Sequence, residues 1–246
     1  MKGGSIVSMG CLALALFTNA QAAPRSFDIS LRADVVIAAD GTVESLEWQD
    51  KRQGNQLLNA KVEPLAWNWQ FKPASVDGEP APSQTQLDVQ VLGVEQADGS
   101  VALRLGTVST GPRSGAKIIP RFPPNAARAG VSAEVAVVIG IGVDGVSTVE
   151  STEFHGQGKS FRSEFLASAE SAAKGWTFGL ERVAGRPVPA EVRLRFEFCA
   201  PGDNWCARRS SKRAETSAVA PGARRGDAVP LNSVVQLLTQ VSGQEI

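Results

Sequence analysis

A short pattern of aromatic, glycine and proline residues occurs twice in this chain of 246 residues. Each copy begins with Trp-x-Phe, and in each a Gly follows nine residues after the Trp and a Pro eleven residues after it. The matching residues are Trp69, Phe71, Gly78 and Pro80 in the first copy, and Trp176, Phe178, Gly185 and Pro187 in the second. A repeat of this kind predicts that one supersecondary unit is built twice.

Alternating apolar and polar residues predict the strands of each copy. An alternating run at 27–37 leads to Asp40-Gly41, and another at 135–143 leads to Asp144-Gly145. An Asp-Gly pair between alternating runs is a strong signal of a β-hairpin. After the Trp-x-Phe pair, each copy ends in a further alternating run, which predicts a half-buried strand. These final runs lie at 87–91 and 192–198.

A helical stretch lies between the hairpin and the Trp. In the second copy, the apolar residues of 161–173 recur with helical spacing, and Gly175 is placed to end the helix. In the first copy we expect a short or kinked helix at 55–66, because Pro64 interrupts it. The sequence therefore predicts an α+β fold of two tandem small modules, each an antiparallel sheet with a helix packed on one face. The aromatic pairs are expected in the core, where they anchor helix to sheet.

Changes in composition mark the domain boundaries. The first copy gains an extra hairpin at Asp98-Gly99, and a segment rich in Gly, Ser and Pro separates the copies. The first part of the tail is poor in large apolar residues, which predicts disorder. The last part of the tail has enough apolar residues to predict a short helix. The predicted parts are a diverged first module at 24–108, a linker at 109–116, a second module at 117–206 and a disordered tail at 207–246 with a short helix at 229–241.

The N-terminal residues have the pattern of a signal peptide. Lys2 precedes an apolar run at 6–17, and Ala20-Gln21-Ala22 fits a signal peptidase site. We predict cleavage after Ala22, so that residues 1–22 are removed and the mature protein is periplasmic. A membrane-spanning helix needs about 20 apolar residues, more than this run offers. The alternative is an uncleaved segment that anchors the chain in the inner membrane, facing the periplasm.

Two cysteines, Cys199 and Cys206, remain after that cleavage. An even pair at short spacing in an exported protein predicts a disulfide. The alternative is a pair of free thiols in a reducing compartment. A metal site is not expected, because zinc takes four ligands and the only histidine is His155, far away in sequence.

Composition and motifs argue against several classes of function. The formal net charge is zero, whereas a nucleic-acid-binding protein would be strongly basic. Gly158-Lys159-Ser160 resembles the end of a phosphate-binding loop, but Glu153 stands where that loop requires a Gly. A hydrolase triad usually needs a histidine as its base, and the chain has only one. We therefore predict no catalytic residues, no enzyme activity and no cofactor.

The second copy carries further motifs in a fixed order. A Pro-x-Phe-Pro lead precedes the Asp-Gly hairpin, the helix, the Trp-x-Phe pair and the Gly-x-Pro turn, between Lys117 and Phe198. In this order and spacing they resemble the C-terminal domain of TonB-type energy transducers. The first copy resembles the same domain more loosely and lacks the lead. The resemblance is carried by Pro120, Phe122, Pro123, Ala126, Gly130, Val135, Asp144, Gly145, Val146, Trp176, Phe178, Gly185, Pro187 and Val188.

The resemblance implies a periplasmic protein-binding module. In that family the domain binds a short segment of an outer-membrane transporter by strand addition, and it passes on force from a proton-driven motor. Strand addition needs an exposed sheet edge. The candidate edge is the last strand of the second copy, with Val192, Arg193, Leu194, Arg195 and Phe196.

The chain departs from the transducer pattern in two respects. Its N-terminus looks cleavable, and it has no long Pro-rich spacer to cross the periplasm. The alternative function is therefore an envelope scaffold, or a self-associating homodimer, without energy transduction.

Overall fold

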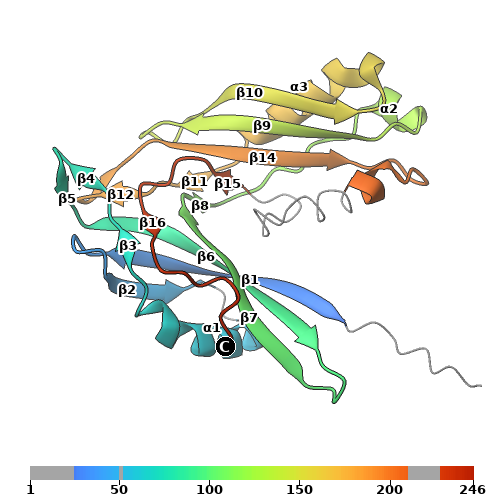
Figure 1. Ribbon diagram of the computed structural model, residues 1–246. Coiled ribbons are helices and arrows are strands. Elements are labelled where there is room, and N and C mark those ends of the chain that lie inside the picture. The colour runs from blue at the N-terminus through green and yellow to red at the C-terminus, as the bar shows by residue number, and fades with distance from the viewer. Residues whose placement is uncertain (1–24, 50–51, 210–227) are drawn as a thin grey trace, which may run out of the picture.

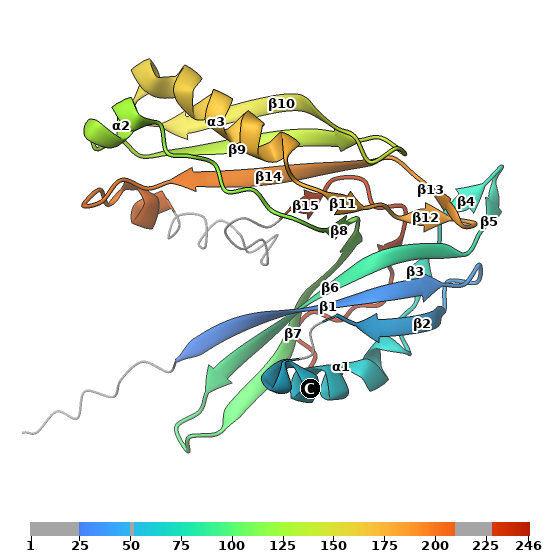
Figure 2. The same ribbon diagram turned by 180° about the vertical axis from the view of Figure 1, so that it is seen from behind.

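The described residues form two large antiparallel sheets, each with a helix packed against it, and three two-stranded sheets (Figures 1 and 2). The computed structural model describes residues 25–49, 52–209 and 228–246. The predicted α+β class is confirmed. The proposed signal peptide, residues 1–22, lies outside the described residues. Within the described ranges, no helix is both long enough and apolar enough to cross a membrane.

The first module contributes four strands to its sheet, in the order β2-β1-β6-β7. The predicted extra hairpin is confirmed, since β6 and β7 pair on either side of the Asp98-Gly99 turn. The elements of this module are β1 (Ser26–Ile37), β2 (Val43–Trp48), α1 (Gln53–Ala66), β3 (Phe71–Lys72), β4 (Ser75–Val76), β5 (Glu79–Pro80), β6 (Ser83–Glu95) and β7 (Val101–Gly111).

The second module repeats this plan, in the strand order β10-β9-β14-β15. Its short strand β12 also pairs with the start of β6, which joins the two modules. The elements are β8 (Arg113–Ser114), α2 (Pro124–Arg128), β9 (Ala133–Ile141), β10 (Ser147–Gly156), the 3₁₀ turn η1 (Lys159–Phe161), α3 (Arg162–Lys174), β11 (Phe178–Gly179), β12 (Arg182–Val183), β13 (Arg186–Pro187) and β14 (Ala190–Phe198).

The repeated Gly-x-Pro pattern forms a small hairpin in each module. Asp77 and Gly78 turn between β4 and β5 with φ of 52° and 88°, and Ala184 and Gly185 turn between β12 and β13 with φ of 48° and 76°. A two-residue turn with positive φ at both central positions suits the twist of a hairpin, and Gly adopts such a φ without steric strain. The sequence repeat is therefore a repeat of backbone conformation.

Each module has its own hydrophobic core. Trp69 and Phe71 are buried in the first, and Trp176 is buried in the second, where the half-buried Phe178 packs against it. The apolar face of α3 places Phe165 at the centre of the second core, in contact with three other phenylalanine rings. Those rings are Phe122, Phe154 and Phe198, at centroid distances of 5.8, 6.1 and 5.0 Å.

The predicted linker between the modules is wrong, whereas the helix of the first module lies where the sequence predicts it. Residues 109–116 do not form a linker, because β7 continues to Gly111 and β8 follows at once and pairs with β11. The helix predicted at 55–66 as short or kinked is α1, which runs for 14 residues and includes Pro64. Pro64 stands in the last turn of α1, where its missing N–H interrupts the helix only near its end.

The prediction for the C-terminal tail is also wrong wherever the structure describes it. Residues 228–246, which we call the C-terminal segment, are ordered and extended rather than helical, with strands β15 (Val229–Pro230) and β16 (Gln236–Leu237). The backbone of this segment pairs with β14, with β3 and with the outer side of β7. Residues 207–209 belong to a helical turn at 205–209, and residues 210–227 lie outside the described ranges.

Candidate functional site

The candidate site is one edge of β14, at the border of the second sheet (Figure 1). The opposite side of β14 pairs along its whole length with β9. On this edge, β15 pairs only with Val192 and Arg193. Among the described residues, no strand lies beside β14 after Arg193, so the second half of this edge carries no strand partner.

The backbone groups that point to this edge follow from the pairing of Glu191. Its N–H donates to Asn232 Oδ1 at 2.7 Å, and its carbonyl accepts from the N–H of Leu231 at 2.9 Å. Backbone groups of a strand point to its two sides in alternation. The N–H and C=O of Arg193 and Arg195 therefore point to the same edge as those of Glu191. We call the outward side of β14 from Glu191 to Phe198 the β14 edge.

The first module shows how the same position is closed by a complete strand. Strand β6 is the equivalent of β14, and β7 pairs with it from Gln86 to Glu95. Strand β15 is the equivalent of β7, but it covers two residues only. The second sheet therefore has a fourth strand over only the start of its edge.

An apolar groove of about 460 Å³ lies beside the C-terminal half of β14. One wall is the lead segment, residues 117–123, and the other is the end of β14. The side chains that line it are mainly apolar. They include Ile118, Ile119, Pro120, Trp176, Phe196 and Phe198.

Trp176 holds the lead segment in place. Its indole Nε1–H donates to the carbonyl of Ile118 at 2.9 Å, and its ring meets that of Phe196 edge-on at 6.2 Å. The ammonium of Lys117 lies 5.3 Å from the centre of the indole ring, within the range of a cation–π contact. Ile118 is 47% exposed and Ile119 is 86% exposed, so this rim offers apolar surface to a partner.

The predicted edge residues divide between two faces of the sheet. Val192, Leu194 and Phe196 are buried in the core below α3. Arg193 and Arg195 project from the opposite face because side chains alternate along a strand. A partner on this edge would therefore meet the backbone of β14 and the side chains of the groove, rather than the side chains of Val192 and Leu194.

The other residues of the motifs lie in the lead segment and in turns. Pro120 and Phe122 belong to the lead segment, and Pro123 is the N-cap of α2. Gly145 has a φ of 79° in the turn between β9 and β10. Gly185 and Pro187 form the β12–β13 hairpin described above.

A buried carboxylate, which the sequence did not reveal, lies on β9 next to β14. The side chain of Glu134 on β9 is 3% exposed and lies 3.6 Å from Nε of Arg195 and 3.3 Å from the guanidinium of Arg209. Arg209 also lies over the ring of Trp205, at 5.6 Å from its centre. Two guanidinium groups balance the buried charge. They also tie the helical turn at 205–209 to the sheet.

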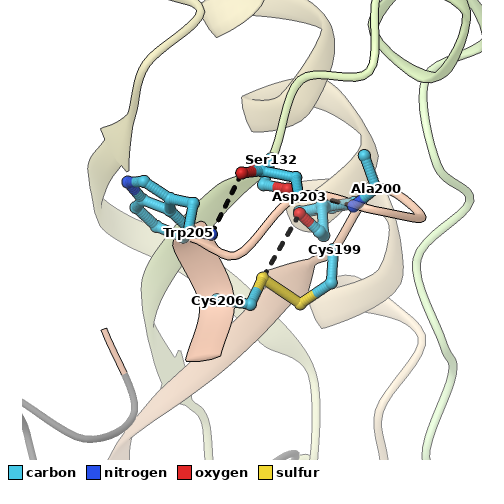
Figure 3. The surroundings of a disulfide bond; sticks show 7 residues. Ser132, Cys199, Ala200, Asp203, Trp205 and Cys206 are labelled. Atoms are coloured by element: carbon cyan, nitrogen blue, oxygen red, sulfur yellow. Dashed lines mark hydrogen bonds between the residues drawn. A yellow bond between two sulfur atoms is a disulfide. The ribbon is translucent and has the colours of Figure 1, made fainter. Parts of the chain in front are cut away.

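The predicted disulfide between Cys199 and Cys206 is present, with the two Cα atoms 5.9 Å apart (Figure 3). It closes the loop that follows β14 and leads into the helical turn at 205–209. In this loop the hydroxyl of Ser132 and the backbone N–H of Trp205 hold the pKa of Asp203 below its usual value. The disulfide therefore fixes the point at which the chain leaves the β14 edge.

Within the described part of the chain, no group of three or more His, Cys, Asp or Glu side chains could hold a metal ion. His155 lies at the end of β10, with Nε2 3.0 Å from the carboxylate of Glu153. This pair is remote from the groove, since neither residue lines it.

Comparisons with known proteins identify no relative, since no family model, no curated protein and no solved structure matches this chain. The likeness to the TonB C-terminal domain remains a prediction from its motifs.

Proposed function

We propose that this protein binds an extended peptide segment of another cell-envelope protein by strand addition at the β14 edge. One observation carries the proposal. Strand β14 already accepts an antiparallel strand at Val192 and Arg193, whereas its second half has no strand beside it among the described residues. In the first module, the equivalent edge is closed by all of β7. Strand addition supplies main-chain hydrogen bonds, and pockets for alternate side chains supply the specificity.

The groove specifies the ligand that fits this edge. A peptide paired with Arg195 would direct alternate side chains to the two faces of the sheet. On the α3 face they would meet the apolar groove at Trp176 and Ile118. We therefore expect a ligand with apolar residues at every second position.

The resemblance of the second module to the TonB C-terminal domain favours a segment of an outer-membrane transporter as the ligand. A disulfide is expected in proteins of oxidising compartments such as the periplasm, which fits this partner. The proposal covers peptide recognition and does not require force transmission.

Titration of the full chain with synthetic peptides tests the proposal. The probes are the N-terminal segments of outer-membrane transporters, and binding is followed by calorimetry and by amide NMR shifts along β14. We expect saturable binding with a Kd below about 1 mM, which corresponds to about 4 kcal/mol. Absence of saturation across the panel at that concentration would contradict the proposal.

A pair of variants tests the mode of binding. Arg195→Pro removes the N–H that points to the β14 edge, and proline is tolerated at such an edge position. Arg195→Ala is the matched control, because it removes the same side chain and keeps the N–H. We expect the proline variant to bind the peptide at least about tenfold more weakly than the alanine variant, since strand addition depends on main-chain bonds. Equal affinity would exclude strand addition.

Self-association through the same edge is the second candidate function. Two copies of β14 could pair antiparallel about a two-fold axis, which is the commonest symmetry of dimers. Sedimentation velocity distinguishes the two candidates: a concentration-dependent dimer that Arg195→Pro abolishes favours a scaffold, whereas a monomer favours the peptide-binding protein.

A further inference from the structure

The C-terminal segment lies on the first module in the manner of a bound peptide. Strand β16 pairs with β3, and the N–H of Gly243 donates to the carbonyl of Leu105 at 2.7 Å. The N–H of Leu105 in turn donates to the carbonyl of Gln244 at 2.8 Å. These are main-chain bonds between an extended segment and two strands that it joins from outside, as in strand addition.

Two aliphatic side chains anchor this segment. Val235 is fully buried and Val241 is 6% exposed, and both belong to the core of the first module. Between them, Leu238 is 61% exposed. The first module thus accepts an extended segment whose Val235 and Val241 enter its core, while Leu238 between them remains exposed.

Strand β15, at the other end of the segment, has few contacts of its own. It pairs with two residues of β14, and the side chains of Val229 and Leu231 are 38% and 44% exposed. A two-residue strand with exposed side chains is weakly held by itself. The residues that follow it are hydrogen-bonded to Glu191 and Glu181 through Asn232, Ser233 and Val234. Attachment to the anchored residues further raises the effective concentration of β15 at the edge.

We propose that the first module carries a binding site for an extended segment with two aliphatic anchors, that residues 234–246 occupy it, and that this docking holds β15 on the β14 edge. The C-terminal segment is then an intramolecular ligand. A partner peptide gains the whole β14 edge only when β15 leaves. The control of partner access rests on the proposed function, but the docking site itself does not.

A variant at the distant anchor tests this coupling. Val241→Asp places a charge in the apolar pocket, and Leu238→Asp is the matched control because it places the same charge on an exposed side chain of the same segment. The readout is the hydrogen exchange of the Leu231 amide, which donates to Glu191 on the other module. We expect exchange at least about tenfold faster in Val241→Asp than in the control, because local opening sets the exchange rate. Equal rates would overturn the proposal.

The docking site is tested with a labelled synthetic peptide of the sequence of residues 228–246. In Val241→Asp the chain's own segment has lost one anchor and competes less, so we expect this peptide to bind at least about tenfold more tightly than to the wild type or to Leu238→Asp. Equal affinity for all three proteins would refute a displaceable segment.

The wild-type protein provides a test that does not depend on the folding of a variant. The amides of Leu231, Leu238 and Gly243 should exchange at least about tenfold faster than those that pair β14 with β9, because the segment opens separately. If they exchange together with the β14 amides at the rate of global unfolding, the segment is an integral part of the fold and the proposal fails.

The transporter peptides separate this proposal from the proposed function. If they bind Val241→Asp and Leu238→Asp equally, peptide recognition stands and control by the C-terminal segment falls. If the transporter peptides bind neither variant while the 228–246 peptide binds Val241→Asp, the docking site is supported and the proposed partner is contradicted.

Discussion

Replacing Glu181 by Gln tests the joint between the two modules and the C-terminal segment. Glu181 is 2% exposed and lies just before β12. Its Oε1 accepts hydrogen bonds from the hydroxyls of Thr85 on the first module and Ser233 on the C-terminal segment, at 2.6 and 2.8 Å. Its Oε2 accepts from the backbone N–H of Val234 at 3.2 Å. One buried side chain thus links three parts of the chain.

The size of the effect follows from these bonds. Gln has the same shape as Glu, so the substitution leaves no cavity, but it offers one oxygen instead of two. If that oxygen keeps the bonds to Thr85 and Ser233, the NH₂ group faces the N–H of Val234 and this buried donor loses its partner. An unsatisfied buried donor costs about 1–3 kcal/mol. We expect a loss of about 2 kcal/mol, which lowers Tm by about 4–8 °C for a chain of this size.

Urea unfolding followed by tryptophan fluorescence measures this loss, with Glu79→Gln as a control on an exposed strand. The control should remain within about 0.5 kcal/mol of the wild type. A double-mutant cycle with Ser233→Ala should give a coupling energy of about 1 kcal/mol, because the two residues share a hydrogen bond. Strict additivity, or a Glu181→Gln protein as stable as the wild type, would refute the view that Glu181 joins the segment to both modules.

Three further predictions concern the second module. Replacing Cys199 and Cys206 together by Ser should lower the free energy of unfolding by about 2.5 kcal/mol, the chain-entropy value for so short a loop, as measured by urea unfolding under oxidising conditions. Phe165→Ala should cost about 3–5 kcal/mol in thermal unfolding, because a fully buried ring is removed from the core. Asp203→Asn should be less stable than the wild type at neutral pH, and the difference should vanish in acid unfolding. The pKa of Asp203 is lowered from 3.8, first by the bond from Ser132, so its contribution is present above 3.8 and is lost as the pH falls through the lowered pKa.

The elements that sequence predicts well are those fixed by local chemistry. Asp40-Gly41 and Asp144-Gly145 form the expected hairpin turns, since glycine allows the positive φ of 85° and 79° that these turns require. Alternation likewise identifies β14, because its residues at 192, 194, 196 and 198 all face the core. These signals lie within a few residues of one another and do not depend on the rest of the chain.

The C-terminal segment was mispredicted because its conformation is decided elsewhere. Its apolar residues do recur at helical spacing, from Leu231 to Val241. An isolated helix of about 12–15 residues is only marginally stable in water. The open backbone groups of β3 and β7, which are distant in sequence, offer the segment main-chain partners and two apolar pockets instead. Tertiary pairing therefore outweighs the local preference.

The burial of the carboxylates of Glu181 and Glu134 could not be predicted from the sequence either. Glu181 accepts hydrogen bonds from Thr85, which is 96 residues away in the sequence, and from Ser233, which is 52 residues away. Glu134 accepts a hydrogen bond from Arg209, which is 75 residues away in the sequence. Nothing in the residues around these carboxylates marks them as buried, because an alternating strand with an acidic residue usually turns that residue to solvent. Contacts with residues distant in the chain remove them from water: Glu181 lies between the two modules and the C-terminal segment, and Glu134 lies against Arg195 and Arg209.

The two modules differ at the same sheet position, and this difference supports the proposed site of peptide binding. Strand β6 has its edge closed by β7, and the outer side of β7 is in turn paired at Leu103 and Leu105 with the C-terminal segment. An exposed edge strand invites unwanted pairing, so natural proteins cover it. Within the described residues, β7 and the C-terminal segment cover the first module, whereas only a two-residue strand lies beside β14, next to an apolar groove. Among the described residues, the second half of the β14 edge has no strand beside it, whereas the equivalent edge of β6 is closed by β7, and this contrast supports the proposed binding of a partner at β14.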